Sequence, residues 1–172
     1  MLPDESEAKA YTESLLSQTY RQAKYCKSGN HTIDSIINCK AIDAEKQHIT
    51  FNYSVHLTTM LTIAPVDICA ILANQIDNAL EACLKIDETN NRFVKIEIYQ
   101  KEAFTFFKVI NPCTENPFNE NRELKSTKNN SNGMHGFGIR NIQETAAKYN
   151  GTLKNDFVDN CFVSVAMILN NN

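Results

Sequence analysis

The sequence predicts an α+β domain, a two-layer sandwich in which a mixed, mostly antiparallel sheet carries helices on one face. Three observations predict it. Runs rich in β-branched and aromatic residues occur in adjacent pairs that are typical of hairpins. Segments with helical spacing of apolar residues separate these pairs, and the chain shows no internal repeat. The expected order is helix, helix, strand, helix, hairpin, long loop, helix and hairpin.

The first half of the chain contains three expected helices and one strand. Residues 4–27 have the composition of a polar helix with a thin apolar stripe, and Ser28-Gly29-Asn30 ends it. A second helix is expected over residues 31–47 and a strand over residues 49–55, from the spacing of their apolar residues. Proline favours the first turn of a helix, so a helix is expected to begin near Pro65 and to run to about residue 87.

The second half contains two expected hairpins around a long polar segment. Residues 93–100 and 103–110 are expected to pair through a tight turn. The segment from Asn111 to His135 is rich in Asn, Pro and Ser, which predicts a long loop, and loops of this length are commonly functional or disordered. Helical spacing resumes after it and ends at Asn150-Gly151. The residues that follow are expected to form the closing hairpin.

Composition and charge limit the class of protein. With 172 residues, 42% of them hydrophobic and 22% charged, the chain is expected to form one globular domain. Its formal net charge of −3 predicts no partner among nucleic acids or anionic membranes. No apolar run approaches the roughly 18 residues of a membrane span, and no signal peptide is recognisable, so the chain as given is expected to be soluble. The six cysteines form no C-x-x-C pair and are interpreted as buried, reduced, cytosolic thiols.

A polar stripe runs along the helix expected over residues 65–87. At about 100° per residue, four polar side chains share one narrow face. They are Asn74, Asp77, Asn78 and Glu81. The apolar residues of the same helix lie on the opposite side; they are Ile68, Leu72, Ile76, Ala79, Cys83 and Ile86. Asn and Asp are mediocre helix formers, so this stripe is either a solvated face or one wall of a binding site.

Three glycines connect the long loop to the helix after it, and they are Gly133, Gly136 and Gly138. Glycine permits close backbone approach, and the free N–H groups of a helix N-terminus bind anions. The segment is therefore either an anion site or a flexible hinge without a ligand. A Rossmann site is excluded because its glycines follow the first strand of a βαβ unit, and a P-loop because no Gly-Lys-Ser/Thr follows. Protein-kinase strings such as H-R-D and D-F-G are absent from the sequence.

Two of these segments resemble the motifs of a known superfamily. "LANQIDNALEA" resembles the N box, and "GMHGFGI" the second glycine box, of the Bergerat-fold (GHKL) ATPases, which include gyrase, MutL, heat-shock chaperones and histidine kinases. "GNHTIDSIINCK", "DNALEAC", "STK" and "HGFGIRNI" are similar to the catalytic domain of the AgrC-like group, the peptide-sensing receptor histidine kinases of Gram-positive bacteria. The resemblance covers about residues 28–170.

The resemblance implies a role for each asparagine of the stripe. Asn78 matches the invariant N-box asparagine, whose side-chain oxygen binds the Mg²⁺ that bridges the phosphates of ATP, and hard oxygen ligands suit this ion. Asn74 stands where hydrolysing members carry a glutamate that activates water. Because a carboxamide cannot accept a proton, Asn74 favours phosphoryl transfer to a histidine over hydrolysis. Asn74 and Asn78 are thus the expected catalytic residues, and Asn78 the expected metal ligand.

The resemblance also implies contacts to the rest of the nucleotide. Asn111 stands where orthodox kinases have an aspartate, and its oxygen is expected to accept a hydrogen bond from the adenine amino group. Glu81 replaces a lysine of those kinases, so a cation from the lid is expected at the phosphates. Lys128 is preferred over Lys125 and Arg122 for this contact. The alternative is that all three are solvated charges of the loop. The remaining expected contacts are His135, Gly136, Phe137, Gly138 and Ile139. The histidine among them is either a phosphate contact or a helix cap.

A place within a larger kinase follows from the same resemblance. Residues 1–28 would be the remnant of a dimerisation and phosphoacceptor hairpin, and residues 29–172 the ATP-binding catalytic domain with a lid over 112–135. The phosphoacceptor histidine would lie on a domain upstream of this chain, in a homodimer that serves a response regulator. The whole protein would be a quorum-sensing membrane receptor, with this part in the cytosol.

Two other functions remain open. An ATP-hydrolysing clamp of the gyrase or MutL kind would share the fold, but Asn74 in place of the glutamate disfavours it. An interaction module that has lost nucleotide affinity would account for the missing aspartate box.

Overall fold

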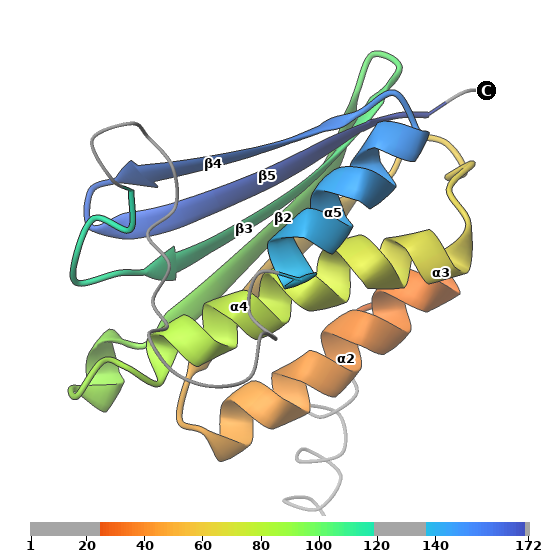
Figure 1. The fold of residues 1–172 in the computed structure, drawn as a ribbon. Coiled ribbons are helices and arrows are strands. Elements are labelled where there is room, and N and C mark those ends of the chain that lie inside the picture. Colours follow the sequence, from red (N-terminus) through yellow and green to blue (C-terminus); the bar gives the residue numbers. More distant parts are fainter. Residues whose placement is uncertain (1–24, 119–136, 171–172) are drawn as a thin grey trace, which may run out of the picture.

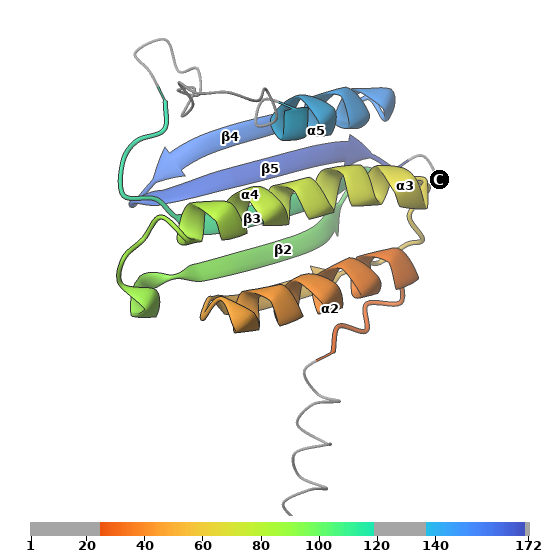
Figure 2. The ribbon, with the colours of Figure 1, turned by 60° about the horizontal axis from the view of Figure 1, so that its bottom comes forward.

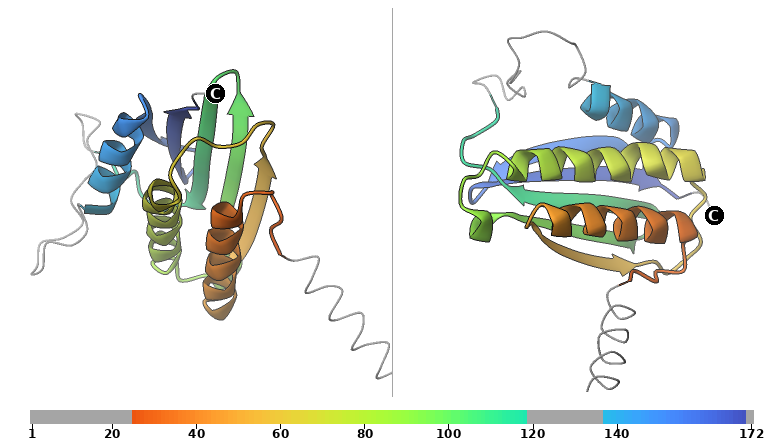
Figure 3. Two further views of the ribbon diagram at one scale, coloured as in Figure 1. Left: turned by 90° about the vertical axis from the view of Figure 1, so that its right-hand side faces the viewer. Right: turned by 90° about the horizontal axis from the view of Figure 1, so that it is seen from below.

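The computed structural model of the chain describes residues 25–118 and 137–170. In this part, helices cover one face of a five-stranded sheet (Figures 1 and 3). The helical elements are α2 (His31–Lys46), α3 (Pro65–Ile68), the π-helical turn η1 (Cys69–Ala73), α4 (Asn74–Cys83), the 3₁₀ turn η2 (Thr89–Asn91) and α5 (Phe137–Lys148). The strands are β1 (Thr50–His56), β2 (Phe93–Lys101), β3 (Phe104–Pro112), β4 (Thr152–Val158) and β5 (Cys161–Leu169).

The sheet is mixed and mostly antiparallel, with the strand order β1-β2-β3-β5-β4. β1 and β2 are parallel, because the helical segment α3–η1–α4 carries the chain back between them. The other neighbouring strands are antiparallel. α2 packs on β1, α4 on β2 and β3, and α5 on β4 and β5. This arrangement confirms the predicted α+β sandwich with helices on one face.

Alternation along the strands explains the position of the core. Every second side chain of β2 and β3 points toward the helices and is buried; these are Val94, Ile96, Ile98, Thr105, Phe107, Val109 and Asn111. The apolar side of the long helical segment meets them, and Leu72, Ile76 and Cys83 are fully buried. A single layer of apolar side chains between sheet and helices therefore fixes which face of α4 remains available to solvent or a ligand.

The helix expected over residues 65–87 differs from the prediction in two ways. The five residues of η1 form a π-helical turn, and two consecutive residues of this turn, Ile71 and Leu72, are both fully buried. α4 ends at Cys83, because the chain turns there and the Ile86 N–H donates to the Cys83 carbonyl at 3.1 Å. Ile86 still reaches the core from this turn, with 8% of its surface exposed.

Two other expectations are met only in part. Most of the helix expected over residues 4–27 falls outside the described residues, and its last three residues, 25–27, are not helical.

Cys26 and Cys83 are buried, and burial raises the pKa of their thiols to about 12 and about 11. Cys39 and Cys69 are exposed and Cys113 and Cys161 are half-buried, which corrects the interpretation of all six as buried thiols. Within residues 25–118 and 137–170, no helix combines the length and the apolar character that a membrane span requires.

The turn between α5 and β4 requires a glycine. Asn150 adopts a left-handed conformation with φ of 49°, and the next residue, Gly151, donates its N–H to the Ala146 carbonyl at 3.0 Å. A Cβ at Gly151 would lie 2.1 Å from the Met167 carbonyl oxygen. Gly151→Ala is therefore expected to lower the free energy of unfolding by about 3 kcal/mol, because backbone must shift to admit the methyl group.

Chemical denaturation measures this loss, and Gly138→Ala is the matched control. A Cβ at Gly138 would meet its neighbours at 3.5–3.7 Å, which is ordinary contact, so the control should change stability by less than about 1 kcal/mol. Equal losses in the two variants would contradict the steric explanation.

A polar cluster joins α3 to the end of α5. The Tyr149 hydroxyl donates to Asp67 at 2.7 Å, Lys148 pairs with the same carboxylate at 3.0 Å, and the Ala64 N–H donates to the Tyr149 oxygen at 3.0 Å. The tyrosine hydrogen bond, followed by the lysine, holds the pKa of Asp67 below its usual range. The cluster therefore stabilises the fold above the unfolded pKa of this carboxyl and stops doing so as the pH falls through its lowered folded value.

Asp67→Asn is expected to cost about 1–2 kcal/mol at neutral pH and to flatten the loss of stability on acidification. Unfolding curves between pH 7 and pH 2 measure both effects. Asp87→Asn, in the exposed turn after α4, is the control for the substitution itself and should change the free energy of unfolding at neutral pH by less than about 0.5 kcal/mol. If Asp67→Asn lost stability on acidification in the same way as the wild-type protein, the acid dependence could not be assigned to Asp67.

Candidate functional site

The polar stripe lies on the side of α4 that faces away from the sheet. α4 runs between α2 and α5 (Figure 2). Asn74, Asp77 and Asn78 are half-buried, whereas Glu81 is exposed. All six apolar residues predicted for the opposite side are buried, so the helical phase inferred from the sequence is confirmed.

The start of α5 packs directly against two residues of the stripe. A Cβ built on Gly138 would lie 3.5 Å from Asn74 Oδ1 and 3.6 Å from Asn78 Oδ1. The first-turn N–H groups of a helix have no acceptor within the helix, and they point outward from its N-terminal end. The structure therefore brings two carboxamides and a helix N-terminus together, although 60 residues separate Asn78 from Gly138.

The Asn74 carboxamide is fixed by the helix that carries it. Its Nδ2 donates to the Ala70 carbonyl at 2.6 Å, within the π-helical turn. This hydrogen bond leaves Oδ1 as the atom that faces Gly138. A carboxamide oxygen can coordinate a cation or accept a hydrogen bond, but it cannot take a proton from water at neutral pH.

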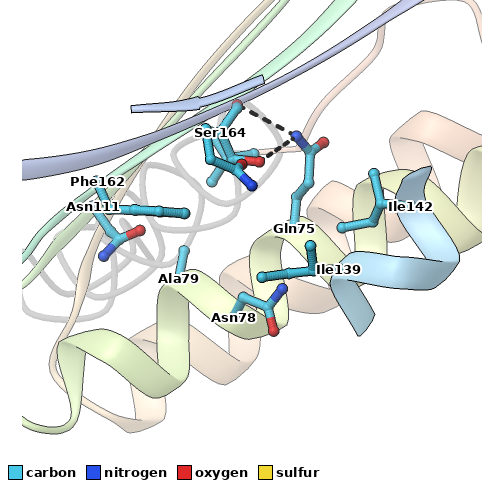
Figure 4. A pocket seen from close by; sticks show the side chains of 10 residues that line it. Gln75, Asn78, Ala79, Asn111, Ile139, Ile142, Phe162 and Ser164 are labelled. Carbon is cyan, nitrogen blue, oxygen red and sulfur yellow. Dashed lines mark hydrogen bonds between the residues drawn. The ribbon is translucent and has the colours of Figure 1, made fainter. Parts of the chain in front are cut away.

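A small cavity of about 10 Å³ continues from Asn78 toward the sheet, with room for about one water molecule (Figure 4). Its lining comes from α4, α5 and strands β3, β4 and β5, and consists of Gln75, Asn78, Ala79, Val109, Asn111, Ile139, Ile142, Asn155, Phe162 and Ser164. Three of the residues predicted for the site, Asn78, Asn111 and Ile139, thus share one cavity. Asn111 is 2% exposed, and its Nδ2 donates to the Pro112 carbonyl at 3.0 Å.

Gln75 belongs to this cavity, and sequence reasoning did not single it out. Its Nε2 donates to the Phe107 carbonyl at 3.2 Å and to Ser164 Oγ at 3.1 Å, which ties α4 to β3 and β5. Its Oε1 is buried without a partner among the described residues. A glutamine next to the apolar face of a helix was the available signal, because a buried amide must find hydrogen bonds.

An aromatic pair borders the cavity on the side of the sheet. The rings of Phe118 and Phe162 stack with centroids 6.1 Å apart and an interplanar angle of 26°. Phe162 lines the cavity, and Phe118 is the last residue described before the segment 119–136. The apolar wall of the cavity is therefore continued by the first residues of the predicted lid.

A cation also reaches the stripe, from α2. The Lys40 ammonium group pairs with the Asp77 carboxylate across the α2–α4 contact. Sequence reasoning placed the expected cation in the lid instead. Those lid candidates, Lys128 with Lys125 and Arg122, lie outside the described residues. His135, Gly136 and Gly133 lie outside them as well, and of Phe137 only its position as the first residue of α5 is described.

The donor set of the site can be compared with the needs of a metal ion. Among the described residues, no group of three or more His, Cys, Asp or Glu side chains could hold one. Mg²⁺ takes few protein ligands, prefers hard oxygens and fills its remaining positions with phosphate and water. The half-buried Asn78 Oδ1, close to a helix N-terminus, fits an ion that arrives with a polyphosphate.

Comparison with solved structures identifies the class of fold. The nucleotide-free catalytic domain of histidine kinase ThkA is similar with a TM-score of 0.64 at 17% identity, over 86% of this chain and 97% of that one. The mycobacterial sensor histidine kinase MprB gives 0.58 at 15% identity, over 80% and 93% of the two chains. The histidine kinase domain of the E. coli osmosensor EnvZ gives 0.52 at 13% identity, over 80% and 85%. The chain therefore has the fold of histidine kinase catalytic domains.

The family follows from the sequence itself. Residues 63–169, more than half of the chain, match the model of the GHKL domain, and the chain belongs to this family. No curated protein matches it. The matched region contains both the stripe of α4 and the glycines that precede α5.

Proposed function

We propose that the chain is the catalytic domain of a sensor histidine kinase, which binds Mg-ATP and transfers the γ-phosphoryl group to a histidine on another domain of the same kinase dimer. The single observation that carries the proposal is the contact of Asn74 and Asn78 with the first turn of α5 at Gly138. An oxygen ligand for a cation and a set of backbone donors for an anion meet there, which is what a magnesium polyphosphate requires.

Each part of the site has a task in this function. When bound, Mg²⁺ neutralises charge on the phosphates, and Asn78 Oδ1 would hold it. The N–H groups at the start of α5 would orient the phosphates, with Gly136, Phe137, Gly138 and Ile139 as the segment concerned. Asn111, which lines the cavity, would accept a hydrogen bond from the adenine amino group. Asn74 would leave the γ-phosphoryl group intact until the histidine arrives, because it supplies no general base.

Features of the sequence support a narrower assignment within the kinases. The strings around Asn38, Asn78, Lys128 and Gly136 are similar to those of AgrC-like peptide-sensing receptors, which supports a quorum-sensing membrane receptor with this domain in the cytosol. The response regulator is a proposed partner, since ThkA has also been solved in complex with the response regulator protein TrrA. The division into a hairpin remnant (1–28) and a catalytic domain (29–172) with a lid (112–135) is part of this proposal.

Phosphoryl transfer to a separately supplied histidine-bearing hairpin domain tests the proposal. ATP labelled at the γ-phosphate should label the hairpin in a magnesium-dependent way, with little free phosphate released. Release of phosphate without transfer would favour the hydrolysing clamp. If calorimetry detected no binding of Mg-ATP, the result would favour an interaction module without nucleotide. The carboxamide at Asn111 and the small size of the cavity are compatible with such a module.

A further inference from the structure

The charges along the stripe are unfavourable for an anionic ligand. Asp77 and Glu81 are acidic and flank Asn78 on the same face of α4. A magnesium polyphosphate remains anionic, so these carboxylates would repel it at close range. A nucleotide at Asn78 therefore needs a cation that offsets at least one of them.

Lys40 is a cation that contacts this face from another helix. It projects from α2, 37 residues earlier in the sequence, and its Nζ pairs with Asp77 Oδ1. The pair crosses between two helices that lie side by side (Figure 2). Its position is thus set by the packing of α2 beside the long helical segment that carries the stripe.

The two members of this pair are unequally exposed. The Lys40 side chain is 20% exposed, whereas the Asp77 side chain is 47% exposed. Most of the Lys40 side chain is therefore covered, as expected when its aliphatic stem packs along its neighbours, while about half of its partner is open to solvent. The ammonium group lies at Asp77, within a Debye length of the rest of the stripe, so its charge influences the potential over the stripe.

We propose that Lys40 is a phosphate-contact residue that exchanges Asp77 for the terminal phosphate groups of the bound nucleotide. Without ligand, Asp77 holds the ammonium group at the edge of the stripe. With ligand, the phosphates provide a stronger acceptor and the ammonium group turns toward them. This inference rests on the proposed function, since it concerns the same nucleotide, and it assigns to α2 the contact that the sequence had placed on Lys128.

Calorimetric titration of the full chain with Mg-ATP, Mg-ADP and adenosine separates this role from a purely structural one. Lys40→Met should weaken Mg-ATP binding by about tenfold, since a hydrogen bond to a charged group is lost. The effect should be smaller for Mg-ADP and absent for adenosine. Asp77→Asn should strengthen Mg-ATP binding severalfold, because it removes both a repelling carboxylate and the competing acceptor of Lys40.

The opposite signs of the two effects are the decisive point. If the pair only clamps α2 to α4, both variants lose the same contact and should affect ATP in the same direction, and that result would overturn the inference. Lys108→Met is the matched control, because Lys108 forms an ion pair with Glu97 at 2.8 Å, between β3 and β2. It should leave all three affinities unchanged.

Stability and ligand binding are read separately. Thermal unfolding without ligand shows whether each variant is folded, and if Lys40→Met is not, the sign of the Asp77→Asn effect decides alone. Wild-type protein that binds no Mg-ATP would overturn the proposed function together with this inference. Wild-type protein that binds normally, with Asp77→Asn unchanged or weaker, would overturn this inference alone.

Discussion

Asn78→Ala is expected to remove most of the stabilisation that Mg-ATP gives to the folded chain. A ligand present at about a hundredfold excess over its Kd adds roughly 2.7 kcal/mol to the free energy of unfolding. Asn78 Oδ1 is the proposed protein ligand of the Mg²⁺ and lies next to the first turn of α5, so its removal leaves the ion without its anchor. Thermal unfolding with a non-hydrolysable ATP analogue and magnesium, compared with unfolding without them, measures the difference.

The control for this prediction is Asn52→Ala. Asn52 is an exposed asparagine on β1, away from the stripe, and its variant should retain the full ligand-induced shift. Asn78 is only half-buried, so the loss of the ligand effect can be separated from any change in the stability of the ligand-free protein. A full shift in Asn78→Ala would disprove its role as the metal ligand.

Asn74→Glu is expected to raise magnesium-dependent ATP hydrolysis by about a hundredfold. A positioned general base contributes about 10²–10⁴-fold to a proton-transfer step, and the lower end applies because the site has not been shaped around a carboxylate. Asn74 Oδ1 already faces the first turn of α5 at Gly138, where the phosphates are proposed to lie. A carboxylate there would lie close enough to activate a water molecule for attack on the γ-phosphate.

Asn74→Gln separates chemistry from shape in this experiment. Glutamine matches glutamate in length, and both substitutions alter the hydrogen bond of Asn74 to Ala70, but only glutamate supplies a base. Phosphate release should therefore rise in the glutamate variant and stay low in the glutamine variant. If both variants bind ATP and neither hydrolyses it, the missing base is not what limits hydrolysis in the wild-type protein.

Local patterns in the sequence were sufficient for most of the secondary structure. The 3.6-residue spacing of Ile68, Leu72, Ile76 and Cys83 identified the buried face of the long helix, because those side chains must meet the sheet. Two-residue alternation identified the hairpins for the same reason. The π-helical turn at Cys69–Ala73 was not predicted, because the residues of a π-helical turn do not differ in composition from those of an α-helix. The packing of the helical segment against its neighbours on both sides selects such a turn.

Some residues of the candidate site were likewise identified from local sequence patterns, and others were not. Asn74, Asn78 and Gly138 were identified from the sequence through two motifs, and the structure brings them into contact. Gln75 and Lys40 were missed. Gln75 was missed because its hydrogen-bond partners are on β3 and β5, and Lys40 because its partner Asp77 is on another helix.

The sequence by itself determined the element order, the face that each helix buries and the chemistry of the stripe, because these follow from periodicity and residue type over short distances. Only the tertiary structure decided which distant groups meet: the first turn of α5 at Asn78, the carboxamide of Asn111 in the same cavity, and the ammonium group of Lys40 at Asp77. Contacts of this kind depend on how helices and strands pack against one another, and no local pattern in a single sequence records that geometry.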